Sequence, residues 1–76
     1  MKISIAIKFG KRLRELRKQK NFSQESFALK VGFHRTYIGM IERGEQNITI
    51  ENISRILKTL EISFSDFFTD FKNEPS

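Results

Sequence analysis

The chain has 76 residues, no cysteine, 38% hydrophobic and 30% charged residues, and a net charge of +5. A chain of this length folds as one small domain without a deep substrate pocket, because only about 60% of its unfolded surface becomes buried. The lack of cysteine excludes a disulfide framework and a cysteine-based metal site, so packing has to stabilise the fold. Lys8 interrupts the first apolar run, so we expect no signal peptide or membrane span, and a soluble, cytoplasmic protein.

Charge is distributed unevenly along the chain. Residues 1–30 hold nine Lys and Arg against two Glu, residues 31–60 hold four against three acids, and residues 61–76 hold one against four. A basic amino-terminal part is typical of a protein that binds a polyanion, and the acidic end suits a different contact, such as a second subunit. Solvated helix surfaces would carry the same charges, so charge alone leaves both interpretations open.

The first expected helix runs from Ile5 to Lys20, because its apolar residues recur at helical spacing while most basic residues point elsewhere. Binding of this basic amphipathic helix to a membrane surface is the alternative, but so short a chain needs the apolar stripe for its core. Ser23 is typical of an N-cap and predicts a second helix from Gln24 to Val31. Gly32 is then expected to end that helix in a left-handed conformation.

A third helix is expected at residues 35–43, directly after the glycine turn. Ile38 and Ile41 face inward at helical spacing, which leaves one polar outward face. That face holds Arg35, Thr36, Gly39, Met40 and Arg43. Two short helices joined by a tight glycine turn have the geometry of a helix-turn-helix.

The rest of the chain predicts two more helices. Gly44 is expected to end the third helix, and Thr49 is a suitable N-cap for a helix from Ile50 to Leu60. Ser63, with an acid three residues later, forms a capping-box pattern before a fifth helix at 64–71. Residues 73–76 are expected to fray. The sequence therefore predicts a single all-α domain over residues 1–76, with five helices.

Several short motifs occur in register within these helices. They are Ser23-Gln24, Gly32, Arg35-Thr36-Tyr37-Ile38, Ile41-Glu42-Arg43-Gly44 and Asn47. With them, the chain from Phe9 to about Phe68 resembles the phage lambda-repressor and Cro type of helix-turn-helix domain, and it is especially similar to the controller proteins of restriction-modification systems. The resemblance implies a lambda-repressor-like fold and a dimeric, sequence-specific DNA-binding regulator of transcription. We expect no enzymatic activity, cofactor or metal.

The outward face of the third helix is the expected base-reading surface. A major groove admits one helix, whose polar or small side chains then meet the base edges. Arg35 can bond guanine O6 and N7, Thr36 can bond a base or touch a thymine methyl, and Gly39 lets the backbone approach the bases. Met40 fits a thymine-methyl contact and a core position equally well. Gln46 stands where controller proteins commonly have Arg, which leaves the base contact from this loop open.

Phosphate contacts are expected where helices begin, because free N–H groups and the positive end of the helix dipole attract anions. The resemblance places these contacts at the start of the second helix and around the loop before the fourth. The residues are Ser23, Gln24, Arg43, Asn47 and Thr49. For Tyr37 the resemblance implies a backbone contact that influences groove shape, and simple packing explains this residue equally well.

The resemblance also implies an ion pair between Arg17 and Glu42, which would tie the first helix to the third. Its role would be structural, because the pair would orient the reading helix from behind. If the pair were half-exposed, it would contribute about 1 kcal/mol or less.

Four aromatic residues near the acidic end exceed what one short terminal helix needs for its own core. They are Phe64, Phe67, Phe68 and Phe71. We interpret them as a partly exposed dimer interface, because a second subunit doubles the half-site that a DNA reader of this class recognises. Internal packing of all four is the alternative. The dimer would bind an inverted repeat in double-stranded DNA, and RNA polymerase is a further candidate partner.

Other classes of function compete with this interpretation. A phage-type or antitoxin-like repressor, or an adaptor of the same fold that binds a protein and no DNA, would have the same helices. Arg35 and the basic amino-terminal half favour DNA over the adaptor. For an enzyme, Asp66 and Asp70 are carboxylates at i, i+4 spacing that could hold a cation, but no third ligand joins them, and His34 has no companion ligand either.

Overall fold

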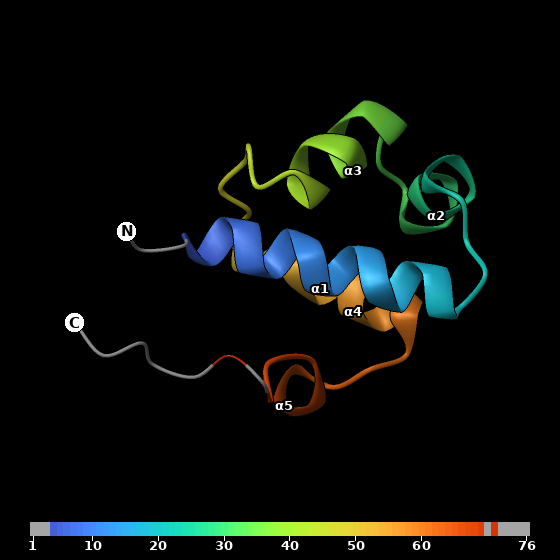
Figure 1. Cartoon of the computed structure of the whole chain (residues 1–76). Coiled ribbons are helices and arrows are strands. Elements are labelled where there is room, and N and C mark those ends of the chain that lie inside the picture. The colour runs from blue at the N-terminus through green and yellow to red at the C-terminus, as the bar shows by residue number, and fades with distance from the viewer. Residues whose placement is uncertain (1–3, 70, 72–76) are drawn as a thin grey trace.

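The computed structural model describes residues 4–69 and 71, and this part of the chain contains five α-helices and no strand. They are α1 (Ile5–Gln19), α2 (Gln24–Val31), α3 (Arg35–Glu42), α4 (Ile50–Leu60) and α5 (Phe64–Phe67). Helix α1 crosses the middle of the molecule, with α3 on one side of it and α5 on the other (Figure 1). The expected all-α architecture with five helices is confirmed.

Side-chain caps start all five helices. The hydroxyls of Ser23, Thr49 and Ser63 each accept the backbone N–H three residues later, as their positions in the sequence predict. Ser4 does the same for α1, and the Nδ1 atom of His34 accepts an N–H at the start of α3. His34 is therefore an exposed capping residue, in line with its interpretation as a polar surface side chain.

Four helices end on a residue with a positive φ. Gly32 (φ 92°) and Gly44 (φ 75°) end α2 and α3 as expected, whereas Asn21 (φ 64°) and Glu61 (φ 58°) take this conformation after α1 and α4. In each case the next residue donates its N–H to the carbonyl five residues earlier, which is the Schellman arrangement. A non-glycine side chain is therefore accommodated at two of these ends.

The fifth helix is shorter than the expected range of 64–71, because α5 ends at Phe67 and Phe68 is its C-cap. The rings of Phe68 and Phe71 pack edge-on, with centroids 4.8 Å apart. A helix of one turn has little stability of its own, so the burial of the aromatic rings decides the path of the chain here. The expected frayed tail, residues 73–76, lies outside the described residues.

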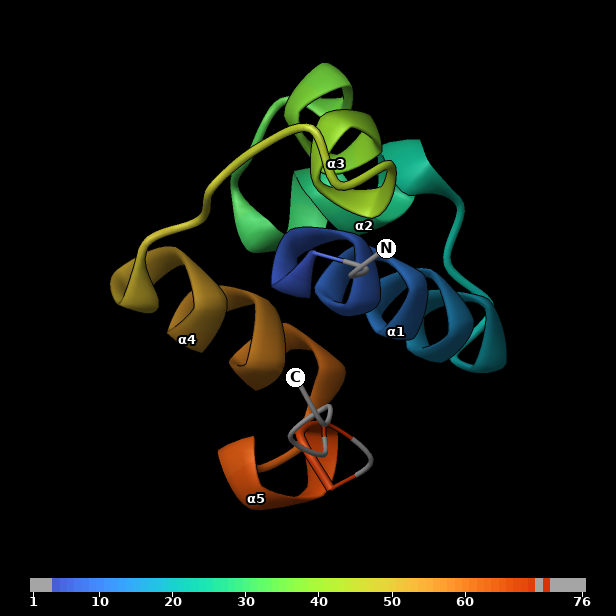
Figure 2. The ribbon, with the colours of Figure 1, turned by 60° about the vertical axis from the view of Figure 1, so that its left-hand side comes forward.

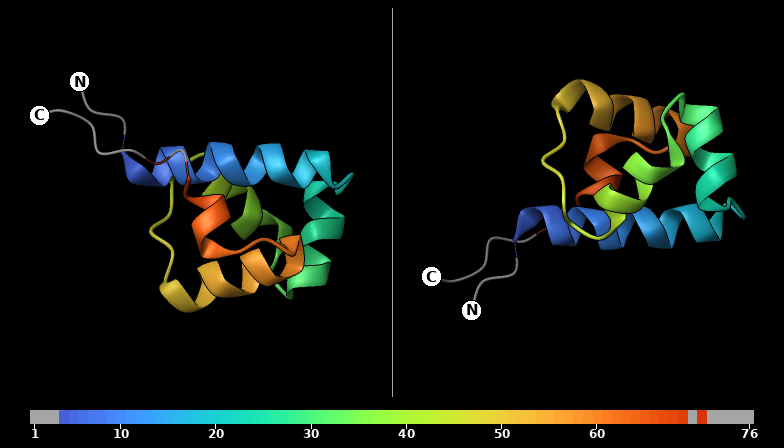
Figure 3. Two further views of the ribbon diagram at one scale, coloured as in Figure 1. Left: turned by 90° about the horizontal axis from the view of Figure 1, so that it is seen from below. Right: turned by 90° about the horizontal axis from the view of Figure 1, so that it is seen from above.

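The core receives side chains from all five helices. Its buried apolar residues are Phe9, Leu13, Leu16, Phe27, Ala28, Val31, Ile38, Ile41, Ile56, Leu57, Leu60 and Phe67. Helices α1 and α4 flank the core on opposite edges, α3 covers one side of the space between them, and α5 covers the other (Figure 3). Within the described residues, no helix is long and apolar enough to cross a membrane.

Helices α1 and α3 approach each other closely because Gly10 has no side chain. A Cβ atom at Gly10 would meet the carbonyl oxygen of Ile41 and would lie 2.5 Å from that of Glu42. Backbone atoms cannot rotate away as a side chain can, so glycine is required here. This contact sets how deeply the carboxyl end of α3 lies against α1 (Figure 2).

Candidate nucleic-acid interface

The inner side of α3 is tied to α1 by a bidentate ion pair. Arg17 donates from Nε to Oε2 of Glu42 at 2.6 Å and from Nη2 to Oε1 at 3.0 Å. The predicted pair is present, but the two side chains are only 7% and 3% exposed, so it is buried rather than half-exposed. Removal of either partner would leave an unpaired charge inside the protein. Breaking this pair therefore costs far more stability than breaking a surface pair.

Gln24 joins the same carboxylate from the start of α2. Its Nε2 donates to Oε1 of Glu42 at 2.9 Å. The exposed residue Gln24 thereby connects the start of α2 with the end of α3. This contact gives Gln24 a structural role, and the phosphate contact expected for it stays a prediction.

The outer side of α3 presents the expected base-reading residues at the surface. Arg35, Thr36 and Arg43 are exposed, and Met40 is half-buried outside the core cluster. The Nη1 atom of Arg35 lies 3.6 Å from Oε1 of Glu25, and both side chains are mostly exposed. This is a loose pair that water screens, so Arg35 is able to exchange Glu25 for another partner.

Gly39 does not lie open on this surface. It is buried, and the Nη1 atom of Arg43 lies 3.2 Å from the position that a Cβ atom on Gly39 would take. The Oε1 atom of Gln24 lies 3.7 Å from the same position. In the unbound chain, two long neighbouring side chains therefore cover Gly39, and the close approach of its backbone to the bases stays a prediction.

Arg43 is paired with Glu45 across the end of α3. Its Nε donates to Oε2 of Glu45 at 2.9 Å and its Nη2 to Oε1 at 3.2 Å. These hydrogen bonds raise the pKa of Arg43 and lower the pKa of Glu45, so both groups are charged at neutral pH. Sequence reasoning missed Glu45. An acid two residues after an Arg, across a helix-ending glycine, was the available signal.

The loop between α3 and α4 holds three more of the expected contact residues. Asn47 and Thr49 are exposed, and the hydroxyl of Thr49 also caps α4. Gln46 is half-buried and donates to the Sδ atom of Met40 at 3.9 Å. Gln46 and Asn47 line one edge of a cavity of about 170 Å³, whose other lining residues are Ile5, Ala6, Phe9, Ile48, Ile53 and Phe68.

Two expected backbone contacts have structural partners of their own. The hydroxyl of Tyr37 accepts a hydrogen bond from Nδ2 of Asn52 at 3.2 Å, and its ring packs edge-on against Phe33. Ser23 forms a reciprocal capping box with Ser26. The packing interpretation of Tyr37 is supported, and its contact with DNA stays a prediction.

Arg55 of α4 holds the turn of the helix-turn-helix. Its Nη2 donates to the carbonyl of Val31 at 3.0 Å, and its guanidinium lies 4.4 Å from the ring centroid of Phe33. A Cβ atom on Gly32 would lie 2.8 Å from the same Nη2 atom. Arg55 therefore fixes the turn that orients α3 relative to α2, and nothing in the local sequence distinguishes it from a solvated arginine.

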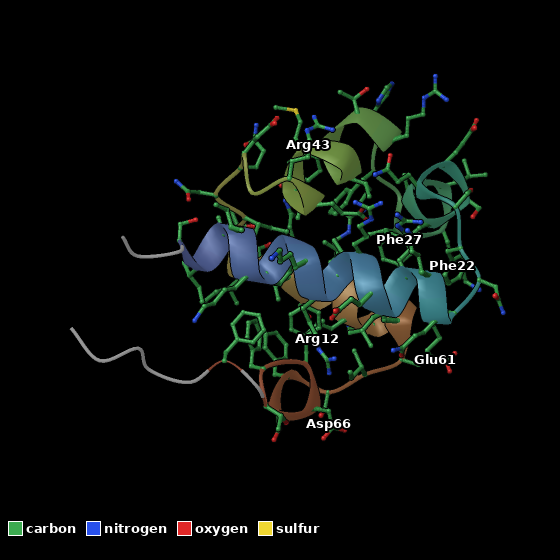
Figure 4. All side chains as sticks on the ribbon, viewed as in Figure 1. Arg12, Phe22, Phe27, Arg43, Glu61 and Asp66 are labelled. Carbon is green, nitrogen blue, oxygen red and sulfur yellow. The ribbon has the colours of Figure 1, made fainter. Side chains whose placement is uncertain are left out.

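Arg12 has a similar structural role at the opposite side of the molecule. It donates to the carbonyls of Phe67 and Asp66 at 3.2 and 3.3 Å, and it lies on the side of α1 away from Arg43 (Figure 4). Together with Arg17, it shows that the basic amino-terminal part does not act as one charged surface. The number of Lys and Arg residues alone therefore overstates the positive charge that is available to a polyanion.

The four aromatic residues expected at a dimer interface differ in exposure. Phe67 is 0% exposed, so it belongs to the core, and its assignment to an interface is wrong. Its ring packs between those of Phe9 and Phe68, at centroid distances of 5.0 and 4.8 Å. Phe68 and Phe71 are partly buried against the core, and Phe64 is 46% exposed.

Of the two carboxylates weighed for a cation site, only one lies in the described part of the chain. Asp66 is exposed on α5, whereas Asp70 lies outside the described residues. Among the described residues, no group of three or more His, Asp or Glu side chains is arranged to hold a metal ion.

Known proteins resemble this chain over most of its length. The helix-turn-helix family profile matches residues 13–67, which include all the expected DNA contacts. The control protein C.MunI of Mycoplasma sp is 42% identical over 71 residues, or 92% of this chain and 96% of the relative. The crystal structure of the restriction-modification controller protein C.AhdI from Aeromonas hydrophila is 43% identical, with a TM-score of 0.79 over 83% of this chain and 96% of that one. The controller protein C.Esp1396I, solved as a tetramer with its natural 35-base-pair operator, is 35% identical, with a TM-score of 0.81 over 91% of each chain.

Proposed function

Because the chain belongs to the helix-turn-helix family, and within it to the controller proteins of restriction-modification systems, we propose that it is a sequence-specific DNA-binding regulator that controls transcription of restriction-modification genes. Helix α3 enters the major groove, and α2 crosses the phosphate backbone. The observation that carries the proposal is the outer side of α3, where Arg35 and Thr36 are exposed on a helix whose inner side is fixed to α1. No enzymatic activity is part of the proposal.

Base reading and anchoring fall to different residues in this proposal. Arg35 exchanges its loose pair with Glu25 for a bidentate contact with a guanine, and Thr36 meets the adjacent base. The anchoring residues are Ser23, Gln24, Asn47 and Thr49, which contact phosphates at the start of α2 and before α4. Met40 and Gln46, which touch each other, lie beside the reading residues and complete the surface that faces the groove.

Fluorescence anisotropy with a duplex from the promoter of the regulated genes and a random duplex of equal length tests this assignment. Arg35→Ala should weaken operator binding by about 1 to 3 kcal/mol, relax specificity at one base position and leave random-duplex binding nearly unchanged. Gln24→Ala should weaken binding to both duplexes similarly. Equal losses on both duplexes for Arg35→Ala would assign that residue to phosphates, and a wild-type chain that binds neither duplex would overturn the proposed function.

The proposal includes a homodimer. Phe64 is 46% exposed, its ring stacks on that of Phe68 at 6.3 Å, and Phe68 lines the cavity beside Ile5, which is itself 65% exposed. These residues form an apolar surface at α5 and the start of α1. Two chains joined there would hold their α3 helices about 34 Å apart, which matches half-sites about 10 base pairs apart or a multiple.

Sedimentation at micromolar concentration tests the dimer. Phe64→Glu should yield monomers that keep their helical circular dichroism, because the side chain is already partly solvated. Leu29→Glu is the matched control, since Leu29 is 82% exposed on α2 and lies outside the proposed interface. A wild-type chain that sediments as a monomer, and binds one half-site as tightly as the full repeat, would overturn the dimer and leave DNA binding intact.

Two further parts of the proposal follow from regulation of transcription. RNA polymerase is the expected protein partner at the promoter, because a bound regulator either recruits or excludes it. The cytoplasm is the expected compartment, because the chain has to meet both the polymerase and the operator there.

A further inference from the structure

Arg43 keeps one of its two hydrogen-bonding edges available. The edge formed by Nε and Nη2 is occupied by the carboxylate of Glu45, at 2.9 and 3.2 Å. The edge formed by Nη1 and the second N–H of Nη2 has no hydrogen-bond partner within the described residues. Two parallel N–H groups on one edge are what a bidentate contact with guanine O6 and N7 requires.

The backbone, rather than chance, places Glu45 beside Arg43. Gly44 has a φ of 75°, and the N–H of Glu45 reaches the carbonyl of Met40 at 2.9 Å in the Schellman arrangement. This turn brings the residue that follows the glycine back to the end of α3. Gly39 supplies the room for the guanidinium, whose Nη1 lies where a larger residue would meet it. The guanidinium is therefore held along the outer side of α3.

The pair with Glu45 also weakens the electrostatic attraction of Arg43 to DNA phosphates. An unpaired Arg gains from any phosphate and displaces counterions whatever the base sequence. Glu45 cancels the charge of Arg43, and its own carboxylate is repelled by phosphates. The pair consequently adds little to sequence-independent attraction, while it keeps one oriented edge that a base can bind.

From this geometry we propose that Glu45 is a specificity-determining residue of the DNA interface, which orients Arg43 toward a guanine and suppresses contact of Arg43 with phosphates. The inference rests on the proposed function and deepens it. It moves Arg43 from the phosphate-binding group, where the sequence-based expectation placed it, to the base-reading group beside Arg35. Glu45 itself touches no base and acts through Arg43.

Binding of Glu45→Gln to an operator duplex and to a random duplex of equal length, over a range of salt concentrations, tests this role. Because the variant frees Arg43 for phosphates, random-duplex binding should tighten about threefold to tenfold at 0.1 M salt. The slope of log K against log salt on random DNA should also steepen by about 0.9, the value for one additional phosphate contact. Operator binding should change by less than about twofold, so the specificity ratio should fall by about threefold or more.

Two controls distinguish the effect of losing the Arg43–Glu45 ion pair from the effect of losing one negative charge. Glu51→Gln removes the same charge from an exposed side chain that has no ion-pair partner within the described residues. It should therefore change the affinity for both duplexes by the same factor and leave the specificity ratio unchanged. In an Arg43→Gln background, Glu45→Gln should no longer change the ratio. If the specificity ratio of Glu45→Gln equals or exceeds that of the wild type, the role of Glu45 is overturned and the proposed function is not. Failure of the wild type to bind either duplex would overturn the proposed function as well.

Discussion

The two sides of α3 are built in opposite ways. On the inner side, Ile38 and Ile41 are 0% and 1% exposed, and Glu42 forms a buried, bidentate ion pair with α1. On the outer side, Arg35 and Arg43 are exposed, and each pairs with an exposed acid. The position of the helix is therefore fixed before any DNA binds. On its outer side, Arg35 is able to exchange its loose partner for a base, and Arg43 keeps one hydrogen-bonding edge available beside Glu45. A reading surface needs both properties, because precise placement comes from the scaffold and recognition comes from new contacts.

Solvent explains why the ion pairs of the two sides behave differently. A buried charge that loses its partner keeps the full cost of leaving water, whereas an exposed charge regains its hydration. Substitutions of the inner side should consequently change stability, and substitutions of the outer side should change DNA recognition. The predictions below test this division, beginning with the largest expected effect.

Glu42→Gln should lower the free energy of unfolding by about 3 to 5 kcal/mol, because Arg17 would then be buried without a counter-charge. Urea denaturation followed by circular dichroism measures the change. Glu25→Gln, which removes the exposed partner of Arg35, is the control and should have a far smaller effect.

A double variant separates the charge from the packing at this site. Arg17→Met combined with Glu42→Leu should recover much of the stability that Glu42→Gln loses, because apolar side chains replace a buried pair well. If Glu42→Gln and Glu25→Gln destabilised the protein equally, the division between the two sides would be wrong.

Gly10→Ala should destabilise the protein by about 1 to 3 kcal/mol, because its Cβ atom meets backbone oxygens of α3. That loss arises despite the higher helix propensity of alanine, worth about 1 kcal/mol. Gly39→Ala is the same substitution on α3 itself, where the nearest atom is the flexible end of Arg43, so stability should be retained or should rise. Urea midpoints of both variants give the comparison, and a Gly10→Ala variant as stable as Gly39→Ala would show that α1 can move away from α3 at no cost.

The sequence predicts the helices because their signals are local. Ser23 and Thr49 cap helices through bonds to residues three positions away, and Gly32 and Gly44 end helices through their own backbone freedom. The bounds of α1 to α4 accordingly agree with the expected ones to within one residue at each end. Only α5, whose length depends on how its rings pack, differs by more.

The contacts that position α3 are not local, and a single sequence does not reveal them. Arg55 binds a carbonyl 24 residues away, and Arg12 binds one 55 residues away. Gly10 looks like any glycine in a helix until α3 is placed against it. The burial of Phe67 likewise depends on the surroundings of α5, because four phenylalanines spread over residues 64–71 do not indicate which ring faces the core. The ion pair of Arg17 and Glu42 was accessible only through resemblance to a family.

The smallest expected effect concerns the turn after α4, which lies on the far side of α1 from Arg43 (Figure 4). Near α3, Gly44 is held by packing as well as by its positive φ, because a Cβ atom there would lie 2.5 Å from a side-chain carbon of Ile7. After α4, Glu61 takes the same left-handed conformation, although it has a full side chain, which lies in solvent.

Glu61→Gly should remove the steric cost of the left-handed conformation, about 1 to 2 kcal/mol. Most of this gain is offset by the greater freedom of glycine in the unfolded chain, so we expect a net stabilisation of about 0.5 kcal/mol. Operator affinity should stay unchanged, since the turn contacts neither side of α3. Thermal unfolding and anisotropy on the same sample measure both quantities, and a loss of affinity without a loss of stability would mean that the placement of α3 depends on this distant turn.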